Sequence, residues 1–191
     1  MEYISESLVD EIMNAKRYFK SKSGEEELYE HYKAGNFNSL LRTYLHCTPP
    51  QSFGPRFEKF YIRKSGFKKI PSNLDRGDFY IENTNQYHEH KFSFAKVDSK
   101  SRFNFVQIRP HQAIEGYVLE VLSEEHGKMF TFNVPKSAMS LLLDEFGGLA
   151  HGTKDAVKEN SRKEYALRGR IGGPLWNKLL PFLGERQIDA G

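Results

Sequence analysis

Residues 77–91, with the sequence GDFYIENTNQYHEHK, constrain the fold more than any other part of the chain. Two runs rich in β-favouring residues, 78–81 and 86–94, flank the polar and turn-prone residues 82–85. This order predicts a β-hairpin. Because side chains alternate between the two faces of a strand, Glu89 and Lys91 are expected on one face and His90 on the other.

The predicted hairpin gathers charged side chains at one place. Asp78 begins the first strand, while Glu89 and Lys91 lie on the second. Two carboxylates suit a hard divalent cation such as Mg²⁺, which prefers oxygen ligands. A neighbouring lysine stabilises developing negative charge or orients an attacking water. The hairpin therefore predicts a metal-dependent hydrolytic site.

The pattern of Asp78, a short gap and then Glu89-His90-Lys91 on a hairpin resembles the PD-(D/E)XK nuclease superfamily, which includes many restriction endonucleases. Gly77 stands where the motif has proline.

The flanks of the hairpin extend this resemblance. Residues 53–62, FGPRFEKFYI, resemble the helix that precedes the hairpin in such enzymes and often supplies another acidic residue, here Glu58. Residues 105–112 resemble their next helix, and residues 116–122 their core strand. The resemblance thus covers the middle of the chain.

The resemblance implies a fold and an activity. The expected fold is α/β, with a restriction-endonuclease-like central mixed β-sheet flanked by helices and an N-terminal helical extension. The implied function is a Mg²⁺-dependent DNA endonuclease, a type II restriction enzyme or its catalytic subunit. Asp78 and Glu89 would hold the metal with the carbonyl of His90, Lys91 would orient the water, and Glu58 would bind a second metal or fix the first.

Two alternatives remain open at this level. One is a repair or junction nuclease of the same superfamily, and the other is a non-catalytic DNA-binding or interaction protein that kept the fold. Because one metal site hydrolyses one strand at a time, cutting double-stranded DNA predicts either a homodimer or a catalytic partner of a larger recognition subunit.

Composition restricts the class of protein. The chain is 38% hydrophobic and 28% charged, which predicts a folded rather than a disordered protein. No apolar run approaches the roughly 20 residues of a membrane helix, and the acidic start MEYISESLVDE lacks the order of a signal peptide. The single cysteine, Cys47, excludes an internal disulfide and agrees with a cytoplasmic location.

A pair of prolines divides the chain into two predicted parts. The dipeptide Pro49-Pro50 separates a predicted helical segment, residues 1–47, from a nuclease core with a basic C-terminal segment, residues 48–191. Within the core the patterns predict helices at 55–64, 137–146 and 174–184, a short edge strand at 67–70, and paired strands at 117–122 and 129–134.

The net charge is only +3, so DNA binding must be inferred from how the charge is distributed. Basic and hydroxyl side chains gather in the loop 95–102 and in the segment 151–170. Those predicted to contact phosphates are Lys96, Lys100, Arg102, Thr153, Lys154, Ser161, Arg162, Lys163 and Arg168. The alternative is an ordinary solvated face. A zinc site is not expected, because His88 and His90 find too few further ligands.

Overall fold

The computed structural model describes residues 54–71, 74–150 and 164–184, together with scattered positions before residue 54. The predicted helical segment 1–47 therefore lies almost wholly outside the described residues. No described helix is both long enough and apolar enough to span a bilayer.

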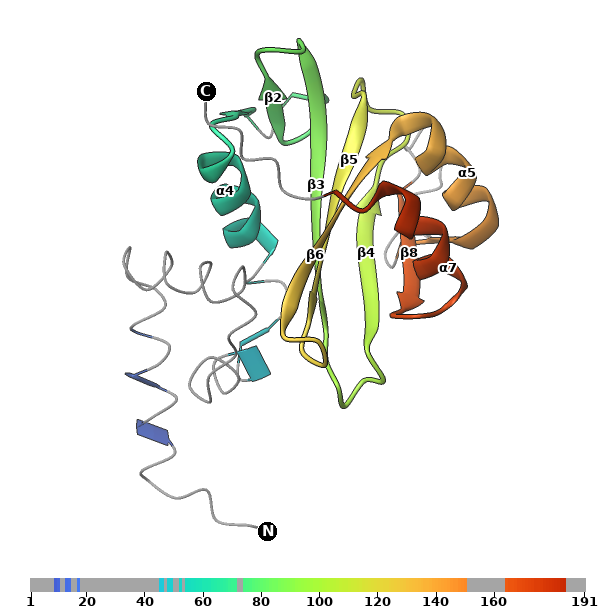
Figure 1. Cartoon of the computed structure of the whole chain (residues 1–191). Coiled ribbons are helices and arrows are strands. Elements are labelled where there is room, and N and C mark those ends of the chain that lie inside the picture. The colour runs from blue at the N-terminus through green and yellow to red at the C-terminus, as the bar shows by residue number, and fades with distance from the viewer. Residues whose placement is uncertain are drawn as a thin grey trace, which may run out of the picture.

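A five-stranded mixed sheet forms the centre of the domain (Figure 1). Its strand order is β1-β2-β3-β5-β6, in which β3 and β5 are parallel and all other neighbours are antiparallel. The strands are β1 (Lys68–Lys69), β2 (Phe79–Ile81), β3 (Gln86–Ala95), β5 (Gly116–Ser123) and β6 (Lys128–Pro135). The α/β class, the mixed central sheet and the β2–β3 hairpin are therefore confirmed.

One face of this sheet is covered by helix α4 (Gly54–Lys64). Pro55 stands in its first turn, where a missing N–H costs little. The ring of Phe57 stacks on Phe92 with 4.1 Å between centroids, and Tyr61 stacks on His90 at 5.2 Å. Because Phe92 and His90 alternate with Lys91 and Glu89 along β3, α4 covers the face opposite to the charged pair.

The other face is covered by a second sheet and by the C-terminal helices. This antiparallel sheet has the order β4-β8-β7, formed by β4 (Arg102–Ile108), β8 (Tyr165–Arg170) and β7 (Gly147–Leu149). Helices α5 (Lys136–Phe146) and α7 (Pro174–Leu179), with the 3₁₀ turn η2 (Leu180–Phe182), lie beside it (Figure 1). Apolar side chains of β4, β8, α5, α7 and η2 pack against those of the central sheet to form the main core, with Trp176 against Phe103, Phe130 and Phe132.

The expected helix at residues 105–112 is wrong. Residues 102–108 form strand β4, because Phe103 and Phe105 are buried while Arg102 and Asn104 are exposed, a period of two. A bulge between Phe105 and Ile108, where Gln107 takes φ +57°, interrupts the alternation and hides it from sequence analysis. The connection between the parallel strands β3 and β5 therefore passes through the second sheet rather than through a helix.

Candidate active site

The first site residue, Asp78, is fixed by the backbone of the neighbouring strand. Its N–H donates to the carbonyl of His88 at 2.8 Å, and its Oδ2 accepts from the N–H of His90 at 2.8 Å. A charge-assisted hydrogen bond of this kind holds the carboxylate in one orientation. Asp78 is thus positioned by hydrogen bonds within the hairpin itself.

The backbone conformation at Gly77 excludes proline, the residue that the PD-(D/E)XK motif has at this position. Its φ is +76°, in the region that only glycine adopts at little cost, whereas proline is restricted to about −65°. A Cβ at this position would also lie 2.5 Å from the carbonyl oxygen of His88. The turn into β2 therefore requires glycine.

Glu89 and Lys91 share the face of β3 that is turned toward the second sheet. Ser93, two residues further along this face, accepts a hydrogen bond from the N–H of Asn104 in β4 at 2.9 Å. The side chain of Glu89 is 3% exposed, and the ammonium of Lys91 is paired with its Oε1. The structure thus brings a buried carboxylate and a partly buried amine into direct contact.

The electrostatics of Glu89 place Asp78 in the same cluster. Burial raises the pKa of Glu89, Lys91 opposes this shift, and the negative charge of Asp78 adds to it. Two carboxylates close enough to disfavour each other's ionisation are relieved by a cation between them. All three predicted residues, Asp78, Glu89 and Lys91, therefore lie together.

Two residues that sequence analysis missed border this cluster. Arg109 follows β4, and its charge lowers the pKa of Glu89 while its own guanidinium donates to Glu164 at 2.7 Å. Tyr117 is the register partner of Glu89 on β5, and burial together with Glu89 raises the pKa of its phenol. No local motif marks either residue, since the second sheet and the parallel pairing bring them to the site.

His90 is part of a buried polar network on the opposite face of the sheet. Its Nε2 lies 3.0 Å from Oε2 of Glu120, and both side chains are at most 1% exposed. Thr131 donates to the other carboxylate oxygen of Glu120 at 3.3 Å. The network fixes His90, whose backbone N–H orients Asp78. It therefore stabilises the position of Asp78 from the opposite face of the sheet.

Glu58 is not brought to the Asp78 cluster. It lies on α4, and its carboxylate accepts from Lys69 of β1 at 2.8 Å. Lys69 is the register partner of Phe79, which packs against Tyr61 of α4. Glu58 and Lys69 therefore interact on the side of the sheet that faces away from Glu89.

The face that carries Asp78 and Glu89 continues toward the hairpin tip as an aromatic surface. Tyr80 and Tyr87 are cross-strand partners with ring centroids 4.9 Å apart. The guanidinium of Arg76 lies 5.4 Å from the Tyr87 ring and donates to its hydroxyl at 3.4 Å. A cation and two half-buried rings thus flank the charged cluster.

The predicted phosphate-contact residues fall into three groups. Lys100, Arg102 and Arg168 lie around the second sheet, in the β3–β4 turn, β4 and β8 respectively. Lys96 instead lies over the ring of Phe94, on the face that α4 also covers. The remainder, Thr153, Lys154, Ser161, Arg162 and Lys163, lie outside the described residues.

The donor set at the cluster suits a hard cation such as Mg²⁺ better than a metal that prefers nitrogen or sulfur ligands. Within the described ranges no three His, Cys, Asp or Glu side chains come together as a ligand set. The pair Asp78 and Glu89, with the carbonyl of His90 between Glu89 and Lys91 in the chain, offers oxygen ligands only. Mg²⁺ is commonly bound by one or two carboxylates and keeps several waters, so these residues fit it.

Comparison with known proteins adds no assignment: no protein-family model matches the chain, and a search of curated proteins finds no match.

Proposed function

We propose that this chain is a Mg²⁺-dependent DNA endonuclease with a restriction-endonuclease-like fold. The observation that carries the proposal is the contact of the buried Glu89 with Lys91 beside the oriented carboxylate of Asp78. A carboxylate pair can hold a metal ion that activates water for phosphodiester hydrolysis, and an amine can stabilise the negative charge that develops. The mixed sheet and the order of α4, hairpin and β5 agree with the resemblance to the PD-(D/E)XK superfamily.

Each side chain has a distinct role in this proposal. Asp78, Glu89 and the carbonyl of His90 would hold Mg²⁺, which when bound polarises the scissile phosphate and lowers the pKa of its water. Asp78 is kept in position by the His90 N–H. Lys91, released from Glu89, places a positive charge where the phosphorane oxygens become negative. Arg109 adds a second positive charge near Glu89.

The experiment is a plasmid cleavage assay with Mg²⁺ and with EDTA. The variants Asp78→Asn, Glu89→Gln and Lys91→Gln should each lower the cleavage rate at least about 100-fold, and a double variant should be little worse than a single one. The matched control is Glu82→Gln, because Glu82 lies on the same hairpin but its side chain is exposed and is paired with Lys68. Cleavage by Glu89→Gln at the rate of the Glu82→Gln control would refute the site.

The same assay separates the biological alternatives. Discrete fragments from a linear substrate would favour a type II restriction enzyme, whereas cutting that depends on branched structure would favour a junction or repair nuclease. A chain that binds DNA but never cuts with Mg²⁺ or Mn²⁺ would leave only a non-catalytic role.

One cluster hydrolyses one strand at a time, so cutting both strands requires a second copy of the chain, a different second subunit or successive binding events. We infer either a homodimer, whose two-fold symmetry would match a palindromic site, or a catalytic partner of a larger recognition subunit. Light scattering with and without DNA distinguishes these assemblies. A strict monomer that cuts nothing alone would reject the homodimer.

A further inference from the structure

The outward face of the second sheet carries a group of arginines. In β4 the exposed side chains include Arg102 and Asn104, and in β8 they include Arg168 and Arg170. The strands pair in register, with Arg102 opposite Arg170 and Asn104 opposite Arg168. Directly opposed residues of an antiparallel pair project to the same side, so these four side chains form one surface, called here the arginine face.

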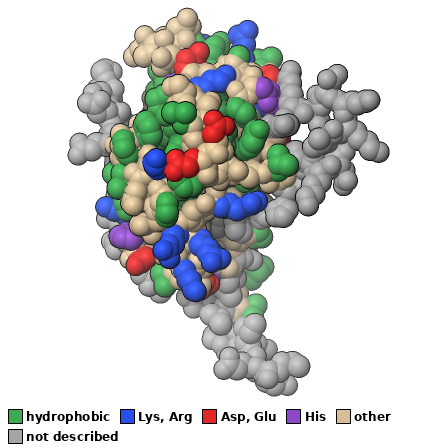
Figure 2. Space-filling model, turned by 90° about the vertical axis from the view of Figure 1, so that its right-hand side faces the viewer, with side chains coloured by type: hydrophobic (Ala, Val, Ile, Leu, Met, Phe, Trp, Pro, Cys, Tyr) green, Lys and Arg blue, Asp and Glu red, His purple; other side chains and the backbone are tan. Residues whose placement is uncertain are grey.

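The arginine face is electrostatically unfavourable in the free protein. Like charges placed directly opposite each other on antiparallel strands destabilise the pair. Among the residues that the structure describes, Arg102, Arg168 and Arg170 have no carboxylate within ion-pair distance. Figure 2 shows Lys and Arg side chains gathered at the level where β4 begins and β8 ends. Uncompensated positive charge of this kind attracts a polyanion.

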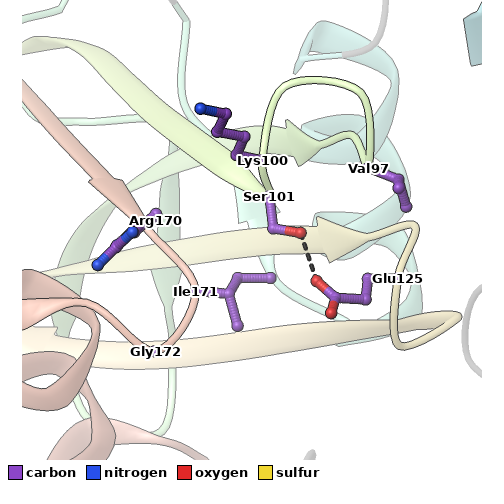
Figure 3. Close-up of a pocket in the computed structure, with 7 residues that line it drawn as sticks. All are labelled: Val97, Lys100, Ser101, Glu125, Arg170, Ile171 and Gly172. Carbon is purple, nitrogen blue, oxygen red and sulfur yellow. Dashed lines mark hydrogen bonds between the residues drawn. The ribbon is translucent and has the colours of Figure 1, made fainter.

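The β3–β4 turn adds a further cation and a cavity at the edge of this face. Lys100 and Ser101 both take positive φ, +57° and +52°. Residues other than glycine adopt this backbone conformation at a cost in free energy. The cavity, about 430 Å³ in volume, is lined by Val97, Lys100, Ser101, Glu125, Arg170, Ile171 and Gly172 (Figure 3). The carboxylate of Glu125 is bonded to the Ser101 hydroxyl, whereas Lys100 and Arg170 supply positive charge to the wall.

We propose that the arginine face, together with Lys100, binds the phosphate backbone of double-stranded DNA at a distance from the reaction. Guanidinium groups bind phosphate through two hydrogen bonds, and the Asn104 amide is a further donor for a phosphate oxygen. The contact is with the backbone, so it contributes affinity for all sequences rather than recognition of one. The inference rests on DNA being the substrate, as in the proposed function, but not on catalysis.

Strand geometry sets the spacing between this surface and the Asp78 cluster. Lys91 is two residues from Ser93, whose hydroxyl meets the N–H of Asn104, and Arg102 is two residues beyond Asn104. Four residues of strand correspond to about 13 Å along the strand direction. The arginines also lie on the exposed side of the second sheet, whereas Glu89 is turned toward its inner side. Site and surface are therefore separable by mutation.

The test measures binding of a fluorescent DNA duplex by anisotropy in EDTA, where no cleavage occurs, over a range of salt concentrations. For the triple variant Arg102→Gln, Arg168→Gln and Arg170→Gln, the slope of log K against log salt should be smaller by about three units. The charge-preserving triple variant to lysine should keep most of the slope. The matched control is the triple variant Lys59→Gln, Arg63→Gln and Lys64→Gln, which removes the same charge from α4 on the other side of the main sheet (Figure 1).

Several outcomes would overturn the inference. Two of them concern the variants: the arginine triple variant keeps the wild-type salt slope, or the α4 control loses as much slope as the arginine variant. The other two concern the wild type: it binds an RNA duplex more tightly than DNA, or it does not bind DNA. Should the triple variant fail to fold, Arg170→Gln alone must lower the slope by about one unit. If the wild type cleaves DNA but the arginine triple variant binds DNA with an unchanged salt slope, the role of the arginine face is rejected and the proposed function stands. Binding through this face without cleavage would reject only the catalytic proposal.

Discussion

Substitution of Gly77 isolates the contact that lets the chain enter β2 at the site. Gly77→Ala places a Cβ 2.5 Å from the carbonyl oxygen of His88, 2.8 Å from its carbon and 3.0 Å from Cγ2 of Ile114. The left-handed conformation costs a non-glycine residue about 1–2 kcal/mol, and forcing atoms into a packed region costs about 1–3 kcal/mol more. The free energy of unfolding should therefore fall by about 2–5 kcal/mol in total.

Gly66 provides the matched control for this substitution. It has nearly the same φ, +67°, but a Cβ there would meet nothing within 4 Å. Gly66→Ala should therefore show only the conformational cost of about 1–2 kcal/mol. Urea unfolding of both variants measures the difference. Equal losses in the two variants would refute the argument that the His88 carbonyl excludes a side chain at position 77.

Three further predictions concern the surroundings of the site. Glu120→Ala should lower the free energy of unfolding by about 3 kcal/mol, because it leaves His90 and Thr131 buried without their acceptor; urea unfolding should show a smaller loss for Glu120→Gln. In the metal-free protein the pKa of Glu89 is raised above 4.5, so the folded state binds a proton more tightly than the unfolded chain. The free energy of unfolding should then decrease as pH rises from about 4.5 through the raised pKa, and titrations of Glu89→Gln should lack this decrease. Glu58→Ala should keep its cleavage activity, because Glu58 is bonded to Lys69 on the far side of the sheet; loss of cleavage would return Glu58 to the metal site.

Local patterns in the sequence were sufficient to predict most elements of the central sheet. The hairpin of β2 and β3, the helices α4 and α5, and the paired strands β5 and β6 all follow from periodicity and turn residues over short windows. The placement of Asp78, Glu89 and Lys91 together also follows, because they lie on adjacent strands of one hairpin. These features depend on neighbours in sequence, where such patterns are informative.

The second sheet was not predicted, because its strands lie far apart in the chain. β4 pairs with β8 across more than 50 residues of sequence, and no local signal specifies that pairing. The resemblance favoured a helix at 105–112, which concealed the alternation of buried Phe103 and Phe105 with exposed Arg102 and Asn104. Glu120 reads as one polar residue in an apolar strand, and only the fold shows its partner His90.

The route of the chain from β3 through β4 to β5 has a consequence for the order of folding. The β2–β3 hairpin joins residues close in sequence, so it can form early, with Asp78 and Glu89 still hydrated. The chain between β3 and β5 includes β4, so parallel pairing of β3 with β5 closes a longer loop than the hairpin does. We therefore expect this pairing to form later. Glu89 is therefore dehydrated only in this late step, beside the charge of Asp78. If Mg²⁺ binds this carboxylate pair as proposed, it should act mainly on the unfolding rate rather than on the refolding rate.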